Sequence, residues 1–319
     1  MKISLAPYLT LIEARGLPAA AIHFLATHRT APELADAFAT PAGRRALERD
    51  LRATGFLRPA RPRVAWPDDA AIQHLADRLA PLQPRLLWRG RPGYPPLLES
   101  SLGHQAPEWL WLMGPEGRLA RPAIAIVGSR ETPPRWLTAA SRLAATLAAA
   151  GICVVSGMAP GADSAAHAGV LRGPDPCQVG GTLAIPARGL LHGDWTPCLL
   201  PPRRMTALTL DRPAAPFQAS LAIRRNHVIA ALGWALVLVA SDLRGGSAYA
   251  VQWAIHHGRP LFCFAAPRAM PPANRQLIRS GAAQPLNLAD PPQSWLAAIQ
   301  HALTPPPSSP STQQPTLPL

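Results

Sequence analysis

The chain has 319 residues, which is enough for one large domain and a smaller one, and 48% of them are hydrophobic, which can support a substantial core. Its 31 basic and 18 acidic residues give a formal charge of +13, which favours a polyanionic partner such as nucleic acid, although the near absence of lysine also fits a GC-rich coding bias. The longest apolar run, 228–240, is shorter than the roughly 20 residues of a membrane helix, which excludes a membrane-spanning class.

The N-terminal part of the chain, up to about residue 82, has helical patterns throughout. Thr30 and Asp68 are predicted N-caps of two of these helices. The tripeptide Gly16-Leu17-Pro18 weakly suggests a helix-hairpin-helix contact with DNA, but a small helical packing domain is the favoured interpretation. The predicted helices are 17–26, 31–39, 41–54 and 67–79.

The central part of the chain begins with two predicted strands, 85–88 and 109–112, and continues into a strand–helix–strand unit at 123–167. Two short apolar runs rich in β-branched residues flank an alanine-rich amphipathic helix, and each run ends in a turn of small residues. In open parallel sheets ligands bind beyond the carboxyl ends of the strands, so both turns are placed where a phosphate could dock.

The rest of the chain alternates helices and strands, which predicts an α/β fold. We expect a doubly wound, mostly parallel Rossmann-like sheet with a small N-terminal helical domain. The expected domains are 1–82 (helical), 83–303 (Rossmann-like) and 304–319 (a disordered tail rich in Pro, Ser, Thr and Gln). The further elements are helices at 162–171, 218–232, 246–257 and 294–302 and strands at 182–185, 207–210, 235–239 and 261–264.

The four cysteines have neither a CxxC motif nor a paired spacing, which favours a reducing compartment over a disulfide framework. The N-terminal apolar run is interrupted by Glu13 and does not resemble a signal peptide. We therefore expect a soluble cytoplasmic protein. The cysteines are Cys153, Cys177, Cys198 and Cys263.

The first strand-end turn, Gly128-Ser129-Arg130, combines backbone donors, a hydroxyl and a guanidinium. Glycine permits close backbone approach, the following helix N-terminus attracts anions, and the planar arginine fork matches phosphate oxygens. The simpler alternative is a glycine turn that only connects strand to helix. No GxGxxG follows, so a dinucleotide fingerprint is absent.

The second strand-end turn contains Ser156, Gly157 and Gly161, which could form another concavity that accepts an anion. Asp163 either caps the next helix or contacts the ligand, and the two interpretations carry equal weight. His167, four residues on, is expected to be a packing histidine rather than a catalytic one.

A third glycine-serine turn, Gly246-Ser247, follows the predicted strand at 235–239. The helix before that strand contains Arg225, Asn226 and His227, which could face the ligand edge of the sheet; a solvated basic turn is the alternative. Three such turns on one sheet are much less expected by chance than any one of them. No GxSxG, Walker or HExxH motif occurs, so we assign no catalytic residue, no metal site and no cofactor.

Taken together, these motifs resemble those of the DprA/Smf family of DNA-processing proteins. The resemblance extends in order from about residue 94 to 302, and it implies a Rossmann-like fold, homodimerisation, binding of single-stranded DNA and loading of RecA, in DNA uptake, transformation and recombination, without catalysis. The matching residues are Gly128-Ser129-Arg130, Ser156, Gly157, Ala159, Gly161, Asp163, Ala166, His167, Arg225-Asn226, Ile229-Ala230 and Gly246-Ser247, with 94–98 upstream and 274–278 and 281–282 downstream.

The chain also departs from the family pattern. His227 replaces the second arginine of an RNR motif, and the segment 192–204 lacks the usual Tyr-Pro turn and basic groove residue, for which Arg203 or Arg204 could substitute. No winged-helix pattern follows residue 302. We expect Arg130 and Arg225 to contact DNA phosphates.

Two alternatives place a different ligand at the same turns. One is an enzyme resembling nucleoside-monophosphate phosphoribohydrolases with a PGG-x-GT-x-x-E motif. Gly245-Gly246-Ser247 partly resembles that motif, but the catalytic glutamate has no counterpart near Gln252. The other is a Rossmann-like protein that senses or binds a nucleotide.

Overall fold

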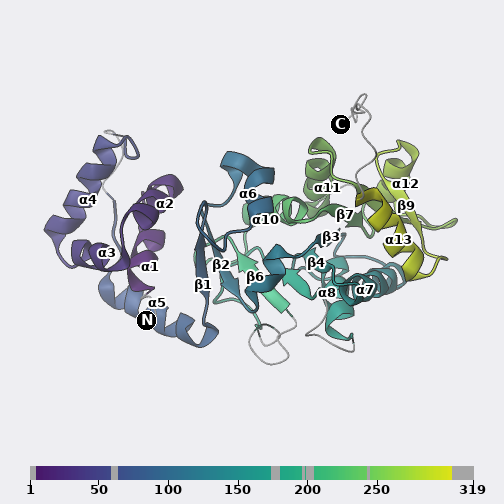
Figure 1. The fold of residues 1–319 in the computed structure, drawn as a ribbon, viewed down its shortest axis with the longest axis horizontal. Helices are drawn as coiled ribbons and strands as arrows, with labels where there is room; N and C mark the ends of the chain where they lie inside the picture. Colours follow the sequence, from purple (N-terminus) through teal and green to yellow (C-terminus); the bar gives the residue numbers. More distant parts are fainter. Residues whose placement is uncertain are drawn as a thin grey trace.

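A nine-stranded sheet runs through the centre of the computed structural model, which describes residues 5–58, 64–173, 180–195, 198, 205–242 and 245–303 (Figure 1). The strand order is β1-β2-β6-β5-β4-β3-β7-β8-β9. The predicted tail and the residues Cys177, Arg203 and Arg204 lie outside the described residues. The strands are β1 Arg85–Trp88, β2 Trp109–Met113, β3 Ala123–Val127, β4 Cys153–Ser156, β5 Thr182–Ala184, β6 Met205–Thr209, β7 Ala235–Leu238, β8 Leu261–Ala265 and β9 Gln284–Asn287.

The direction of the strands confirms the predicted α/β class. β3 to β9 pair in parallel, whereas β1 with β2 and β2 with β6 are antiparallel. From β3 the chain moves outward through β4, β5 and β6, then returns to place β7 on the other side of β3. In the register, Ile124 of β3 lies opposite Val154 of β4 and Ala235 of β7. The strand order therefore reverses between β3 and β7, the position where such sheets bind ligands.

Helices cover both faces of the sheet, and successive side chains along each strand pack alternately against the two helix layers. On β3, Ile124 and Ile126 pack with one layer and Ala125 and Val127 with the other. The first layer contains α7 Pro134–Ala149, α8 Ala162–Leu171 and α13 Pro292–Leu303, and the second contains α6 Pro96–Leu102, α10 Ala219–Leu232 and α11 Gly246–His256.

Besides α1 Ala6–Glu13 among the N-terminal helices, three short elements of the sheet region were missed, although the predicted strands and main crossovers are present. They are α6, α12 Pro272–Arg279 and β9. β9 has the sequence QPLN with one buried residue, and it lies at the sheet edge, where a proline is tolerated. Asn274 of α12 is fully buried and donates to the carbonyls of Val239 and Phe264 at 3.0 and 2.9 Å, so it ties the ends of two strands together.

Among residues 5–58 and 64–84 the structure describes five α-helices before the sheet, and their apolar side chains form one continuous cluster with Trp111 and Met113 of β2. Thr30 caps α3 as predicted, in a capping box with Glu33. Asp68 occupies the N-cap position of α5, but its side chain forms no capping hydrogen bond. The helices are α1 Ala6–Glu13, α2 Ala19–His28, α3 Ala31–Phe38, α4 Pro41–Ala53 and α5 Asp69–Leu79.

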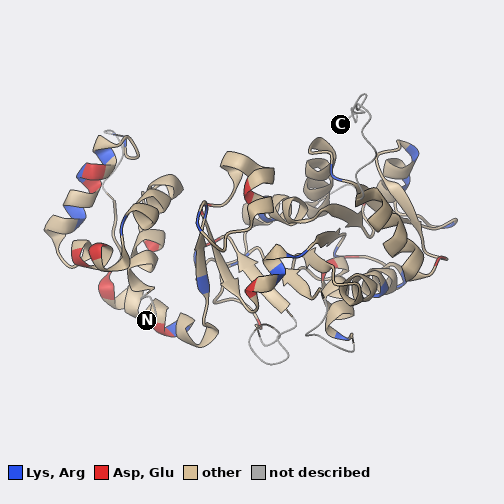
Figure 2. Cartoon of the chain, in the orientation of Figure 1, with Lys and Arg blue, Asp and Glu red and all other residues tan. Residues whose placement is uncertain are grey.

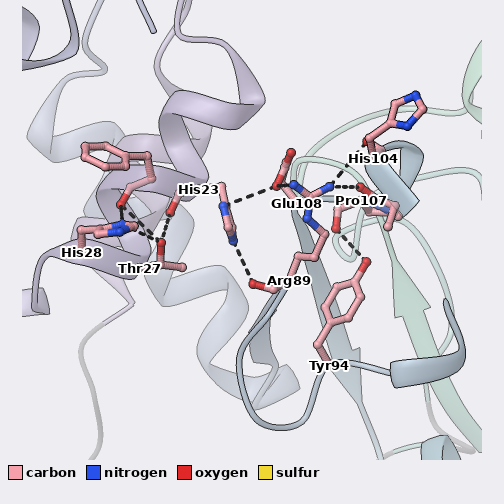
Figure 3. A network of polar contacts seen from close by, with 10 residues as sticks. His23, Thr27, His28, Arg89, Tyr94, His104, Pro107 and Glu108 are labelled. Carbon is pink, nitrogen blue, oxygen red and sulfur yellow. Dashed lines mark hydrogen bonds and ion pairs between the residues drawn. The ribbon is translucent and has the colours of Figure 1, made fainter. Parts of the chain in front are cut away.

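A polar network joins these helices to the sheet (Figure 3). The ring of His23 in α2 lies between the Arg89 carbonyl, 2.9 Å from Nε2, and the Glu108 carboxylate, 3.5 Å from Nδ1. The guanidinium of Arg89 lies 3.1 Å from the same carboxylate. Glu108 is therefore the common partner of His23 and Arg89, side chains from two parts of the chain.

Three cysteines fall within the described residues. Cys153, Cys198 and Cys263 are free and buried, and burial raises the pKa of each thiol to about 12. They act as small apolar side chains. Within the described residues, no helix is long and apolar enough to cross a membrane.

The network at Glu108 predicts a stability effect. Glu108→Gln removes the carboxylate shared by His23 and Arg89, and we expect it to lower the free energy of unfolding by about 1 to 2 kcal/mol. The measurement is the midpoint of urea unfolding. The control is Asp36→Asn, because Asp36 is exposed on α3 and has no hydrogen bond or ion pair to another described residue. Equal midpoints for the two variants would show that the network does not stabilise the fold.

Candidate functional site

A cavity of about 390 Å³ opens at the carboxyl ends of β3, β4 and β7, beside α10. Its walls come from the three glycine-containing turns and from one side of the helix, where Ala222, Arg225 and Asn226 share a face. The sequence analysis expected a ligand at this edge. The lining residues are Val127, Gly128, Ser129, Arg130, Glu131, Ala159, Asp163, Ala222, Arg225, Asn226, Gly245, Gly246 and Ser247.

The first two turns pack directly against each other because glycine occupies both contact points. A Cβ on Gly128 would lie 2.7 Å from the Cβ of Ala162. A Cβ on Gly161, which has a φ of +83°, would lie 2.4 Å from the carbonyl oxygen of Arg130. The close approach allows the Ala162 N–H to donate to the Ser129 carbonyl at 3.3 Å.

The hydrogen bonds of Ser129 change the role expected for this residue. Its N–H donates to the Ala240 carbonyl at 2.8 Å, so this backbone donor is used within the protein. Its hydroxyl oxygen accepts from the N–H of Glu131 at 3.3 Å. Arg130, by contrast, is exposed, and its guanidinium has no ion pair to a described residue. The charge of Arg130 is therefore the available anion-binding group of this turn.

Arg225 lies at the base of the cavity and is only 7% exposed. Its Nη1 lies 3.5 Å from Oδ2 of Asp163. The guanidinium packs against Gly157, where a Cβ would lie 1.7 Å from Nη1. Burial lowers the pKa of Arg225, the neighbouring Asp163 carboxylate opposes that shift, and the charge of Arg130 adds to it. Nε of Arg225 has no hydrogen-bond partner among the described residues.

Asp163 does not cap α8, because the N-cap position belongs to Gly161. The carboxylate instead accepts from the N–H of Ala159 at 3.3 Å and pairs with Arg225. A carboxylate is acceptor-only when ionised, so its direct partners here are donors from the protein itself. The capping interpretation was wrong.

Ser156 at the end of β4 and His167 in α8 both point into the protein. Ser156 is fully buried and its hydroxyl donates to the Ile126 carbonyl at 2.6 Å. His167 is buried between the hydroxyl of Thr182, 2.7 Å from Nδ1, and the carbonyl of Gly157, and burial lowers its pKa. The expectation of a packing histidine is confirmed. Ser156 lies outside the cavity lining.

On the other side of the cavity, Asn226 fixes the start of α11 by donating to the Gly246 carbonyl at 2.7 Å. The hydroxyl of Ser247 lies 3.0 Å from that of Ser241. His227 follows Asn226 but lies outside the lining, because one residue turns an α-helix by about 100°. Its pKa is lowered by burial and by the nearby His257.

A second cavity, of about 220 Å³, shares Arg130, Ala159 and Arg225 with the first. It adds Arg188 and Phe217, which the sequence analysis missed. The guanidinium of Arg130 lies 5.6 Å from the centroid of the Phe217 ring, and Phe217 is 52% exposed. Arg188 and Phe217 flank the segment 189–216, which is rich in proline and has no hydrophobic periodicity. The one sequence signal that could have indicated them is an aromatic residue, Phe217, near basic residues.

The chemistry of the joined cavities is that of anion recognition. Three arginines, Arg130, Arg188 and Arg225, line them, with two carboxylates, Glu131 and Asp163. Among the described residues, no group of three or more His, Cys, Asp or Glu side chains could hold a metal ion. Arginine forks, an amide and an exposed aromatic ring suit a ligand with phosphate groups and planar bases.

Comparison with known proteins identifies relatives for the sheet region. A DNA processing protein DprA of Mycobacterium tuberculosis is 31% identical over 174 residues, which cover 49% of this chain and 40% of that protein. The match therefore spans less than half the length of this relative.

Two solved structures share the fold. DNA processing protein A from Streptococcus pneumoniae matches with a TM-score of 0.62 and 21% identity, covering 93% of this chain and 98% of that one. DNA processing protein A from Helicobacter pylori, whose structure addresses its single-stranded DNA binding mode, matches with a TM-score of 0.56 and 21% identity over 69% of this chain and 97% of that one. The family model described as DNA recombination-mediator protein A matches residues 85–293, well over half of the chain, and the protein belongs to that family, as the DprA/Smf resemblance implied.

Proposed function

We propose that this protein binds single-stranded DNA at the joined cavities and acts without catalysis. The observation that carries the proposal is Arg130, which belongs to both cavities and lies over the exposed ring of Phe217. A cation for the backbone beside an aromatic surface for the bases is the arrangement with which proteins hold single strands. The Helicobacter pylori protein of the same fold is described as having a single-stranded DNA binding mode, which supports single-stranded DNA as the ligand.

The two best-placed arginines have different roles in this proposal. Arg130 is exposed and contacts a phosphate directly, so its contribution depends strongly on salt. Arg225 is buried and paired with Asp163, so it contributes a donor of fixed position at the base of the groove. Its Nε has no hydrogen-bond partner among the described residues. Arg203 and Arg204 remain candidates from the sequence alone, and Arg188 joins the set.

The glycines and polar residues of the turns shape the groove more than they bind the strand. Gly128, Gly157 and Gly161 permit close contacts that a Cβ would prevent. Asn226 and Gly246 hold the helices on either side of the cavity. The proposed contacts to DNA are therefore few and mostly cationic.

The absence of catalysis is also part of the proposal. Of the two carboxylates along the cavities, Asp163 is held by Arg225 and by a backbone N–H, which leaves it poorly placed to accept a proton from a substrate. Family membership is the basis for the rest of the proposal. It comprises a role in DNA uptake, transformation and recombination, RecA as a partner, homodimer formation and a cytoplasmic location.

Arg130→Ala tests the phosphate contact. We expect about a tenfold loss of affinity for labelled oligo-dT and a decrease of about 0.7 in the slope of log affinity against log salt concentration, because one counterion fewer is released. Fluorescence anisotropy across a salt series measures both quantities. Arg279→Ala, a loss of charge at the exposed end of α12, is the control. The groove is misassigned if the two variants bind alike.

Phe217→Ala tests the base contact. Loss of a stacking surface is expected to weaken oligo-dT binding by about 1 to 3 kcal/mol with little change in the salt slope, whereas Phe217→Tyr retains affinity. A duplex of the same length should be affected much less, because its bases are already stacked. The stacking role is rejected if Phe217→Ala binds oligo-dT as tightly as the unaltered protein.

Gly157→Ala tests whether the position of the Arg225 guanidinium matters for DNA binding. Its Cβ would lie 1.7 Å from Nη1 of Arg225 and 2.3 Å from Oδ2 of Asp163, so the ion pair must move. We expect a destabilisation of about 1 to 3 kcal/mol and weaker oligo-dT binding, measured by thermal unfolding and anisotropy. Gly117→Ala is the matched control, because a Cβ there meets nothing within 4 Å. Unchanged binding by a folded Gly157→Ala protein would remove Arg225 from the proposed site.

A further inference from the structure

A second basic surface lies on α4, in the N-terminal helices and outside the sheet-edge cavities. This 13-residue helix carries four arginines and two carboxylates. Figure 2 shows α4 banded with basic and acidic residues at the end of the molecule opposite α12 and α13. Beside the helix is a cavity of about 390 Å³ lined chiefly by Arg44, Arg45, Arg49 and Arg52, with Trp66 at its wall.

The carboxylates around this surface are already engaged. Glu48 accepts from Nε1 of Trp66 at 2.9 Å, and Asp50 pairs with Arg29 at 2.7 Å. Arg45 and Arg49 are exposed, and neither forms a hydrogen bond or an ion pair with another described residue. Glu48 lines the same cavity and keeps its negative charge, because its partner Trp66 is neutral, so the four arginines of the lining outnumber its one carboxylate.

The other two arginines are held in place. Arg44 pairs with Asp69 at 2.8 Å, and its Nε donates to the Phe38 carbonyl at 2.9 Å. Arg52 donates to the Arg58 carbonyl at 3.1 Å. Ordering a long side chain in advance reduces the entropy lost when it binds a ligand.

The spacing of the arginines suits a ligand with regularly repeated charge. Arg45, Arg49 and Arg52 follow one another at four and three residues, so they share one side of the helix, with Cβ atoms of successive arginines about 5 to 6 Å apart. Guanidinium forks match phosphate oxygens bidentately. Trp66 is partly buried and its N–H is satisfied, so the surface offers cations and little free apolar area.

We propose that the arginine face of α4, defined by Arg44, Arg45, Arg49 and Arg52, is a second nucleic-acid contact that binds the phosphodiester backbone without reading bases. It is separate from the sheet-edge site and does not require that site to bind DNA. Because it recognises phosphates only, it binds duplex and single-stranded DNA alike. A long DNA molecule that reaches both ends of the protein can occupy both surfaces.

The test uses the full chain with Arg45→Gln and Arg49→Gln combined. Glutamine keeps the helix propensity of arginine and removes the charge, and circular dichroism checks the fold. The probe is a labelled DNA duplex, which offers phosphates but no unstacked bases, measured by anisotropy across a salt series. We expect the slope of log affinity against log salt concentration to decrease by about 1.8, because two phosphate contacts are lost.

The matched control removes two charges elsewhere, with Arg78→Gln and Arg279→Gln, at exposed ends of α5 and α12. A decrease in slope confined to the α4 variant supports the proposal. Equal slopes for the two double variants would overturn it, since net charge alone would then account for binding.

Two further measurements distinguish DNA binding by α4 from DNA binding at the sheet-edge site and from binding to anionic membranes. Arg130→Ala should leave duplex binding through α4 largely intact, so failure of the sheet-edge site and failure of the α4 surface give different results. The second arm measures sedimentation with phosphatidylserine vesicles. If the α4 variant loses vesicle binding but keeps the duplex affinity and slope, the nucleic-acid contact is rejected and the surface binds anionic membranes.

Discussion

The site depends on the close contact between the turns after β3 and β4. Gly128 faces the Cβ of Ala162, and Gly161 faces the backbone of Arg130, at distances that leave no room for a side chain. In this contact the Ser129 carbonyl accepts from the Ala162 N–H, and the exposed Arg130 and the buried Arg225 line the same cavity. A tightly packed interior transmits small displacements, so an added methyl group at these turns would move the arginines as well.

The buried ion pair below this contact gives the groove its polarity. Arg225 and Asp163 are almost equally buried, so the carboxylate balances a charge that would otherwise be costly to remove from water. Arg130 lacks such a partner among the described residues and faces solvent. The joined cavities therefore present one fixed and one exposed guanidinium, a division that fits a ligand arriving from solvent and held by its phosphates.

Sequence patterns predicted the fold well where hydrophobic periodicity was strong. β3, α7 and β4 follow the expected order, and the three glycine turns meet at one edge. β9 was missed because one buried residue in QPLN carries almost no periodic signal. The sequence could not show that the hydroxyl of Ser156 turns into the sheet, or that His227 leaves the face shared by Arg225 and Asn226, since both depend on side-chain direction.

By itself the sequence determined the α/β class, the meeting of the glycine turns at one edge of the sheet and the family motifs, because these follow from local periodicity and from residue types at fixed spacing. Only the tertiary structure decided which groups are available there. In the folded protein, Asp163 and the Ser129 N–H are used in internal contacts, and Arg188 and Phe217 line the same cavity as Arg130. Partners distant in the sequence are chosen by the packing of turns and helices, which no local pattern records.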